Sequence, residues 1–133
     1  MKSRWRHHNK VAFLHLDYAN FKSDIEALKV EVLAADAEMM HEPKGTVLVL
    51  IDLRDTVASA AVVQLFKESS KITTPYIRRH ALIGISGMKR YLANKVAQLA
   101  GAKMRLFNSE EAALDWLTSG MVADHADAGD VIG

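Results

Sequence analysis

Polar side chains follow two of the apolar segments in the chain and could form a ligand site. In open α/β sheets, ligands bind beyond the carboxyl ends of strands, at the point where the strand order reverses. A helix that begins after Gly87 would add free backbone N–H groups for an anion, and Lys89 would reinforce them. The alternative is a tight turn with ordinary surface lysines. The predicted ligand-binding residues are Asp17, Asn20, Ser86, Gly87 and Lys89.

Two aspartates, Asp17 and Asp52, end apolar segments and could hold Mg²⁺ through carboxylate oxygens. Phosphoacceptor receiver domains have such an acidic pocket, with a lysine that Lys89 would match. Receivers, however, have five strands and adjacent acidic residues after the first strand, and this chain shows neither pattern. We therefore expect aspartates that cap loops, and an enzyme that uses Mg²⁺ is only a third hypothesis.

The histidines and Ser86 do not predict a metal or a catalytic site. None of the six histidines has the i, i+4 or clustered spacing of a zinc site. His15 alternates with apolar residues, so we expect a hydrogen-bonded histidine in the core. Ser86 lies between glycines, but a nucleophile elbow needs glycine at position 88, where this chain has Met88. We predict no metal, no cofactor and no catalysis.

The composition indicates a compact single domain. Half of the 133 residues are hydrophobic and a quarter are charged, with 17 basic against 16 acidic side chains. A formal net charge of +1 disfavours nucleic-acid binding, which needs a basic excess. No apolar run approaches the ~20 residues of a membrane span, and no signal peptide is evident. The absence of cysteine fits a cytoplasmic protein.

Short apolar segments alternate with segments of helical periodicity, which is typical of a parallel sheet covered by helices. A capping box of Ser23 and Glu26 predicts the start of the first helix. Ser59 and Ser109 predict the starts of later helices, and a further helix follows Gly87. The predicted strands span residues 11–17, 47–53, 81–85 and 104–107.

The order of these elements predicts an α/β domain without an internal repeat. Because crossovers between parallel strands are right-handed, we expect a four-stranded, mainly parallel sheet in the order 2-1-3-4 with helices on both faces. The sequence also leaves open an additional amino-terminal edge strand around residues 3–7. We assign a basic amino-terminal segment to 1–10, the domain to 11–120 and a flexible tail to 121–133.

Three stretches of this chain, taken together in this order, resemble the small bacterial STAS-like proteins. They are Gly45-Thr-Val-Leu-Val-Leu-Ile-Asp-Leu, Pro75-Tyr-Ile-Arg-Arg-His-Ala-Leu-Ile-Gly-Ile-Ser-Gly-Met-Lys and Phe107-Asn-Ser-Glu-Glu-Ala-Ala-Leu-Asp-Trp-Leu. STAS domains take their name from sulphate transporters and anti-sigma-factor antagonists. The resemblance implies a parallel sheet with helices and a non-enzymatic role in protein–protein interaction.

The resemblance also suggests where regulation would act. Anti-sigma-factor antagonists carry a phosphorylated serine where a strand enters a helix, in an Asp-Ser-Ser-Gly-like motif. The matching junction here, residues 52–59, lacks that motif but keeps hydroxyls at Thr56 and Ser59. The leading hypothesis is a regulatory interaction module that binds an unidentified protein or forms a homodimer. The alternative is a small-molecule or anion binder in the crevice between the first and third predicted strands.

Overall fold

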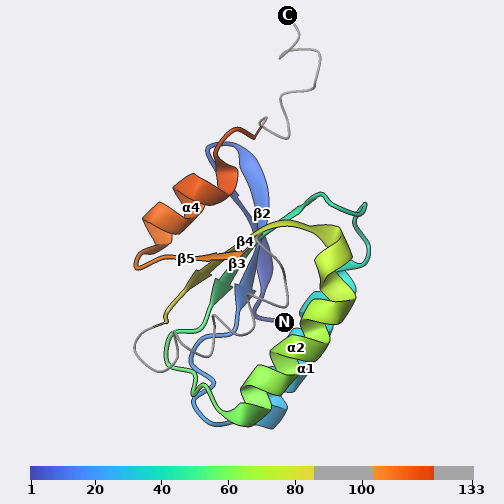
Figure 1. Cartoon of the computed structure of the whole chain (residues 1–133), viewed down its shortest axis with the longest axis vertical. Helices are drawn as coiled ribbons and strands as arrows, with labels where there is room; N and C mark the ends of the chain where they lie inside the picture. Colours follow the sequence, from blue (N-terminus) through green and yellow to red (C-terminus); the bar gives the residue numbers. More distant parts are fainter. Residues whose placement is uncertain (86–103, 122–133) are drawn as a thin grey trace, which may run out of the picture.

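A five-stranded mixed sheet forms the centre of the computed structural model, which describes residues 1–85 and 104–121. The strands lie side by side in the order of the sequence (Figure 1). β1 is antiparallel to β2, and the remaining neighbours are parallel. They are β1 (Arg4–His8), β2 (Val11–Asp17), β3 (Val47–Asp52), β4 (Ile77–Ile83) and β5 (Met104–Leu106).

The sheet contains the four predicted strands and the amino-terminal edge strand, but the predicted order 2-1-3-4 is wrong. β3 pairs with both β2 and β4, so the first and third predicted strands are not neighbours. Right-handed crossovers that advance in one direction place successive helices on the same face of a sheet. Both α1 (Ile25–Met39) and α2 (Ala60–Thr73) accordingly cover one face, side by side (Figure 1).

The opposite face of the sheet is covered by α4 (Glu110–Thr118), which follows β5. Helices therefore lie on both faces, as predicted. A short 3₁₀ helix, η1 (Thr74–Tyr76), connects α2 to β4. The helix predicted after Gly87 and the tail beyond residue 121 lie outside the described residues. No helix in the described parts of the chain is long and apolar enough to cross a membrane.

Alternating side chains divide the core into two layers. Along β2, Leu14 and Leu16 pack beneath α1 and α2, whereas Val11 and Phe13 pack beneath α4. This period of two is the ordinary geometry of a strand, in which successive side chains point to opposite faces. His15 shares its parity with Val11 and Phe13, so its ring lies on the α4 face of the sheet.

Serine and aspartate caps begin the three α-helices in the described part of the chain. Ser59 Oγ accepts from Val62 N, and Ser109 Oγ accepts from Ala112 N, at 3.2 Å in each case, as predicted. The capping box predicted for Ser23 and Glu26 is wrong. α1 begins one residue later, because the Asp24 carboxylate accepts from Ala27 N at 3.0 Å. A carboxylate at this position also interacts favourably with the positive end of the helix dipole.

A buried carboxyl group joins the two helices on the same face. Ser69 Oγ of α2 donates to Asp36 Oδ1 of α1 at 2.7 Å, and Asp36 is 3% exposed. Its Oδ2 atom has no hydrogen-bond partner among the described residues. Burial raises the pKa of Asp36 to about 6, although the bond from Ser69 lowers it. The position therefore favours the neutral carboxyl more than water does, so that Asp36 changes its charge near pH 6.

Asp24→Ala should lower the free energy of unfolding by about 1 kcal/mol, because the first turn of α1 loses its cap. Ser23→Ala is the matched control and should change it by less than about 0.5 kcal/mol. Urea unfolding followed by circular dichroism measures both variants. Equal decreases in the free energy of unfolding of the two variants would contradict Asp24 as the dominant cap.

Asp36 should also make the stability depend on pH. Its pKa is higher in the folded chain than in the unfolded chain, so its contribution is greatest at low pH and is lost as pH rises through about 6. Between pH 7 and pH 5 the wild type should therefore gain about 1 kcal/mol relative to Asp36→Asn. Urea unfolding at both pH values tests this difference. Parallel pH profiles for the two proteins would contradict it.

Candidate functional site

The loops that follow β2 and β3 stay paired after the strands have ended. Their backbones exchange hydrogen bonds in the manner of a parallel ladder, and an isolated bridge joins Lys22 to Thr56. Three residues take left-handed backbone angles to allow this path: Asn20 (φ 64°), Lys22 (φ 54°) and Asp55 (φ 58°). The bonds are Tyr18 N to Asp52 O (3.1 Å), Asn20 N to Arg54 O (2.8 Å), Lys22 N to Asp55 O (2.9 Å) and Val57 N to Lys22 O (2.8 Å).

The Thr56 hydroxyl joins the paired loops. Its Oγ1 donates to the Tyr18 carbonyl oxygen at 2.6 Å and accepts from Phe21 N at 3.1 Å. The residue is 3% exposed, so both bonds satisfy backbone groups that water does not reach. Thr56 therefore fixes the path of the chain from β2 into α1.

Asp52 ends β3 with a buried carboxylate that binds the Arg54 guanidinium. Arg54 Nη2 donates to Oδ2 at 2.6 Å, Nε donates to Oδ1 at 3.0 Å, and the Arg54 backbone N donates to Oδ1 at 3.0 Å. Burial alone would raise the pKa of Asp52, but the bonds from Arg54 hold it below its usual value. Asp52 is therefore an anion, and the half-exposed Arg54 side chain supplies the opposite charge.

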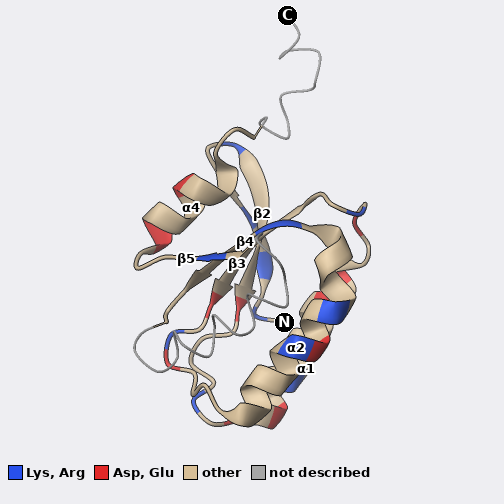
Figure 2. Ribbon diagram, in the orientation of Figure 1, with Lys and Arg blue, Asp and Glu red and all other residues tan. Residues whose placement is uncertain are grey.

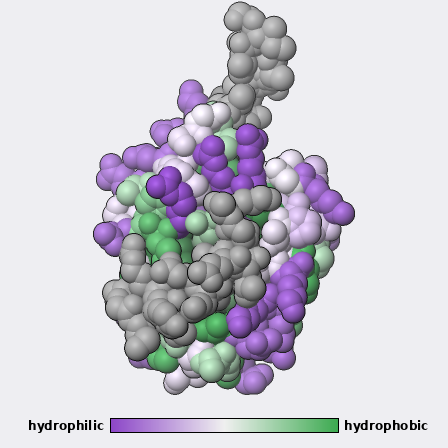
Figure 3. All heavy atoms as spheres, in the orientation of Figure 1, coloured by the Kyte–Doolittle hydropathy of each residue, from purple (hydrophilic) through white to green (hydrophobic). Residues whose placement is uncertain are grey.

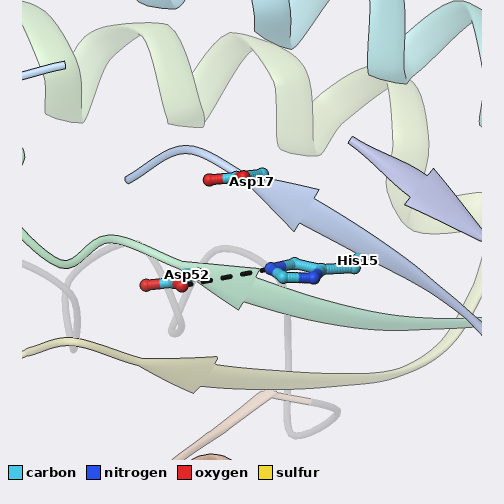
Figure 4. Close-up of side chains that lie close together, drawn as sticks. All are labelled: His15, Asp17 and Asp52. Atoms are coloured by element: carbon cyan, nitrogen blue, oxygen red, sulfur yellow. Dashed lines mark ion pairs between the residues drawn. The ribbon is translucent and has the colours of Figure 1, made fainter. Parts of the chain in front are cut away.

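His15 lies one strand away from Asp52, and Figure 4 shows its ring directed toward that carboxylate. Arg6 Nη1 lies 3.1 Å from His15 Nδ1. Because a guanidinium only donates, Nδ1 must accept, and the ring proton is on Nε2. Burial and then the Arg6 and Arg4 guanidiniums lower the pKa of His15, against opposing effects of Asp17 and Asp52. The imidazole is therefore neutral.

The Nε2 atom of His15 is buried and has no hydrogen-bond partner among the residues that the structure describes. It lies 4.0 Å from Asp52 Oδ2, which is too long for a hydrogen bond. His15 was predicted to be a hydrogen-bonded core residue. The structure confirms its burial, at 5% exposed, but satisfies only one of its two ring nitrogens.

Asp17 completes a group of three potential ligands. It lies opposite Asp52 in the β2–β3 register, and acidic residues stand at the ends of both strands in Figure 2. One ligand atom from each of His15, Asp17 and Asp52 lies within 4.8 Å of the other two. Lys2 Nζ approaches the Asp17 carboxylate at 3.5 Å and is itself 42% exposed. The three side chains border an open polar hollow of about 570 Å³.

The structure brings together only part of the predicted ligand-binding set. Asp17 and Asn20 both line the polar hollow, whereas Ser86, Gly87 and Lys89 lie outside the described residues. The crevice predicted between the first and third strands is not formed, because β3 occupies that position. Arg4, Arg6 and Glu110 also line the hollow, and the sequence did not indicate them because they come from β1 and α4.

Gly84 occupies the turn that enters the predicted anion-binding segment. It has a φ of 85°, and a Cβ atom here would lie 2.5 Å from Arg54 N. Glycine is therefore required both by the backbone angle and by the close approach of the neighbouring loop. The packing of the two loops therefore explains why glycine stands at this position, and the explanation requires no bound ligand.

The two hydroxyls predicted as phosphorylation sites lie in different environments. The Thr56 hydroxyl is buried and engaged in the bonds described above. Ser59 is partly exposed at the amino end of α2, where it caps the helix. A hollow at this point is lined by both ends of the paired loops, with Lys22 and Asp24 on one side and Ser59 on the other.

A comparison with known protein families finds a match to the SpoIIAA-like family over residues 12–118. Neither the curated proteins nor the solved structures contain a match to the chain. The matched range runs from β2 to the last residue of α4, so it includes the paired loops, both helical layers and the residues that line the polar hollow except Arg4 and Arg6. This match confirms the STAS-like resemblance.

Thr56→Val should lower the free energy of unfolding by about 2–4 kcal/mol, because it leaves the Tyr18 carbonyl and the Phe21 N–H buried without a partner. Thr56→Ser keeps the hydroxyl and loses one methyl group, so it should cost about 1 kcal/mol. Chemical unfolding of the two variants measures the contrast. A valine variant as stable as the serine variant would show that the hydroxyl bridge contributes little.

Proposed function

The chain belongs to the SpoIIAA-like family, and from this membership we propose that it is a non-catalytic regulatory module that acts through protein–protein interaction. We further propose that its first partner is a second copy of the same chain. The observation that carries this proposal is an exposed apolar face on α1, the helix that also packs against the sheet.

α1 is apolar on two sides. Its inner side buries Leu28, Val32 and Met39 in the core. On its outer side, Val30 is 70% exposed, Leu33 is 52% exposed and Met40, the residue that ends the helix, is 43% exposed. A surface helix with only one buried face normally carries polar residues on the other. The outer apolar side therefore indicates a surface that a partner covers.

The outer face of α1, defined by Val30, Leu33, Ala34, Ala37 and Met40, has the pattern of a helix–helix contact. The large residues recur at steps of three and seven, which is the spacing of a helix seam. The two exposed alanines leave space into which a large residue of a second helix can pack. No charge interrupts the set, so two copies related by a two-fold axis can pair the same face without burying an ion.

The neighbouring helix does not share this character. α2 exposes one large apolar residue, Ile72 (45% exposed), but Glu68 and Lys71 are exposed with it, and hydrophilic side chains gather over the helix in Figure 3. The apolar face is thus a property of α1 and not of the whole helical layer. This contrast supports α1 as the contact surface.

Phosphorylation at Ser59 is part of the proposal, because this hydroxyl begins α2 beside the amino end of α1. A phosphate here would meet the positive end of the α2 dipole and the Lys22 side chain that lines the same hollow. It would add negative charge beside the amino end of α1, the helix that carries the apolar face. Phosphorylation of Thr56 would require its hydroxyl to break two buried hydrogen bonds, so we favour Ser59 as the phosphorylated residue.

The proposal predicts a homodimer that depends on the α1 face. Wild-type protein should sediment as a dimer in analytical ultracentrifugation at micromolar concentration. Val30→Glu/Leu33→Glu should be monomeric, or weaken the dimer by at least about 100-fold, because two charges per chain would be buried without partners.

Ala112→Glu is the matched control, because it adds a carboxylate at an exposed alanine of α4 on the opposite side of the sheet. It should leave the dimer unchanged, and circular dichroism should show all variants folded. A monomeric wild type would reject self-association. A dimer that resists the double substitution would reject α1 as its interface.

A further inference from the structure

We propose that His15, Asp17 and Asp52 form a binding site for a divalent first-row transition-metal ion such as Zn²⁺, at the carboxyl ends of β2 and β3. This site is separate from the proposed interaction surface, because His15 and Asp52 lie on the α4 face of the sheet. The spacing of the histidines along the sequence predicted no metal site. The juxtaposition arises from the strand register, which places Asp17 opposite Asp52.

The donor set has the chemistry of such an ion. One imidazole nitrogen and two carboxylate oxygens suit Zn²⁺ and its neighbours, whereas Mg²⁺ and Ca²⁺ prefer oxygen ligands alone. The three ligand atoms lie within 4.8 Å of one another. Ligands at about 2.0–2.2 Å from a common zinc ion lie about 3–4 Å apart, so small rotations of the side chains would close the site around an ion.

The unpartnered nitrogen of His15 indicates that the site is built for a ligand. His15 is 5% exposed, and its Nε2 atom faces Asp52 without a hydrogen bond to any described residue. A buried polar atom without a partner is costly in a folded protein. The carboxylates alone would be an ordinary acidic cluster, but this nitrogen lies beside them and is directed into the same space (Figure 4).

Lys2 and Arg54, which neutralise the carboxylates of Asp17 and Asp52, are partly exposed and could move into solvent when an ion binds. Lys2 is 42% exposed and Arg54 is 60% exposed, whereas the Asp52 side chain is 4% exposed. In the metal-free chain these long side chains supply the charge that the ion would bring. Metal binding would then replace two partly exposed cations with one dication.

Arg6 opposes the metal in this arrangement. An Nε2 atom that ligates a metal leaves the ring proton on Nδ1, where Arg6 now donates. Arg6 must therefore release His15, and Glu110 provides its second acceptor at 3.3 Å. This requirement separates a metal site from an anion site, since removal of Arg6 strengthens the first and weakens the second.

The test uses the full chain carrying His7→Gln/His8→Gln, which removes the two adjacent histidines of β1. Calorimetric titration with Zn²⁺ should show one site per chain, and Mg²⁺ should bind at least about tenfold more weakly. Asp17→Asn should weaken Zn²⁺ by at least about tenfold. Asp55→Asn is the matched control, because Asp55 lines the same hollow but is outside the donor set, and it should leave the affinity unchanged.

Two further measurements address His15 directly. Arg6→Gln should bind Zn²⁺ severalfold more tightly, because the glutamine oxygen can accept from the Nδ1 proton that a bound metal requires. Nitrogen-15 NMR of the histidine rings should show His15 with its proton on Nε2 in the free protein, and on Nδ1 after Zn²⁺ is added. The NMR result does not depend on a His15 variant that folds.

Several results would overturn the proposal. The first is the absence of Zn²⁺ binding. The second is a Zn²⁺ affinity that is the same with and without the Asp17→Asn substitution. The third is a His15 ring whose proton stays on Nε2 when the protein is saturated with Zn²⁺. Binding that disappears in the His7→Gln/His8→Gln background would show an adventitious ion only. Inorganic phosphate that binds in the hollow and is lost in Arg6→Gln would establish an anion site instead.

Discussion

The structure depends on the pairing of β2 with β3 and on its continuation through the two loops that follow. Hydrogen bonds between the loop backbones begin where the strand ladder ends, and the Thr56 hydroxyl satisfies one donor and one acceptor of the first loop. Because Tyr18 and Thr56 are buried, the groups that the Thr56 hydroxyl joins require these partners. The same pairing fixes the positions at which α1 and α2 begin and places Asp17 opposite Asp52.

This constraint gives the two faces of the sheet different properties. Successive crossovers advance in one direction, so α1 and α2 together close one face over a continuous apolar layer. The other face is covered by α4, and the carboxyl ends of β2 and β3 border a polar hollow there. The proposed contact surface on α1 and the proposed metal site therefore use opposite sides of one sheet.

Much of the local structure could be predicted from the sequence, because it depends on neighbouring residues. The strand β2 has the predicted bounds, and Ser59 and Ser109 cap their helices as their side chains suggest. The strand order could not be predicted in this way. β2, β3 and β4 are similar apolar runs, and right-handed crossovers allow more than one order. The site shows the same limit: Asp17, Asn20 and Asp52 were identified from the sequence, but the residues that β1 and α4 bring to the hollow were not.

The first residues of the chain join the two proposed sites in one network of contacts. The Glu31 carboxylate of α1 accepts from the backbone N of Lys2 at 2.9 Å and of Ser3 at 2.8 Å. Although burial opposes it, these bonds hold the pKa of Glu31 below its usual value, so the contact is charged. Ser3 Oγ in turn accepts from Asp17 N, and Lys2 Nζ lies beside the Asp17 carboxylate. An ion that displaces Lys2 from Asp17 therefore acts on a segment that α1 holds directly, which gives occupancy of the polar hollow a physical route to the helix that we propose as the contact surface.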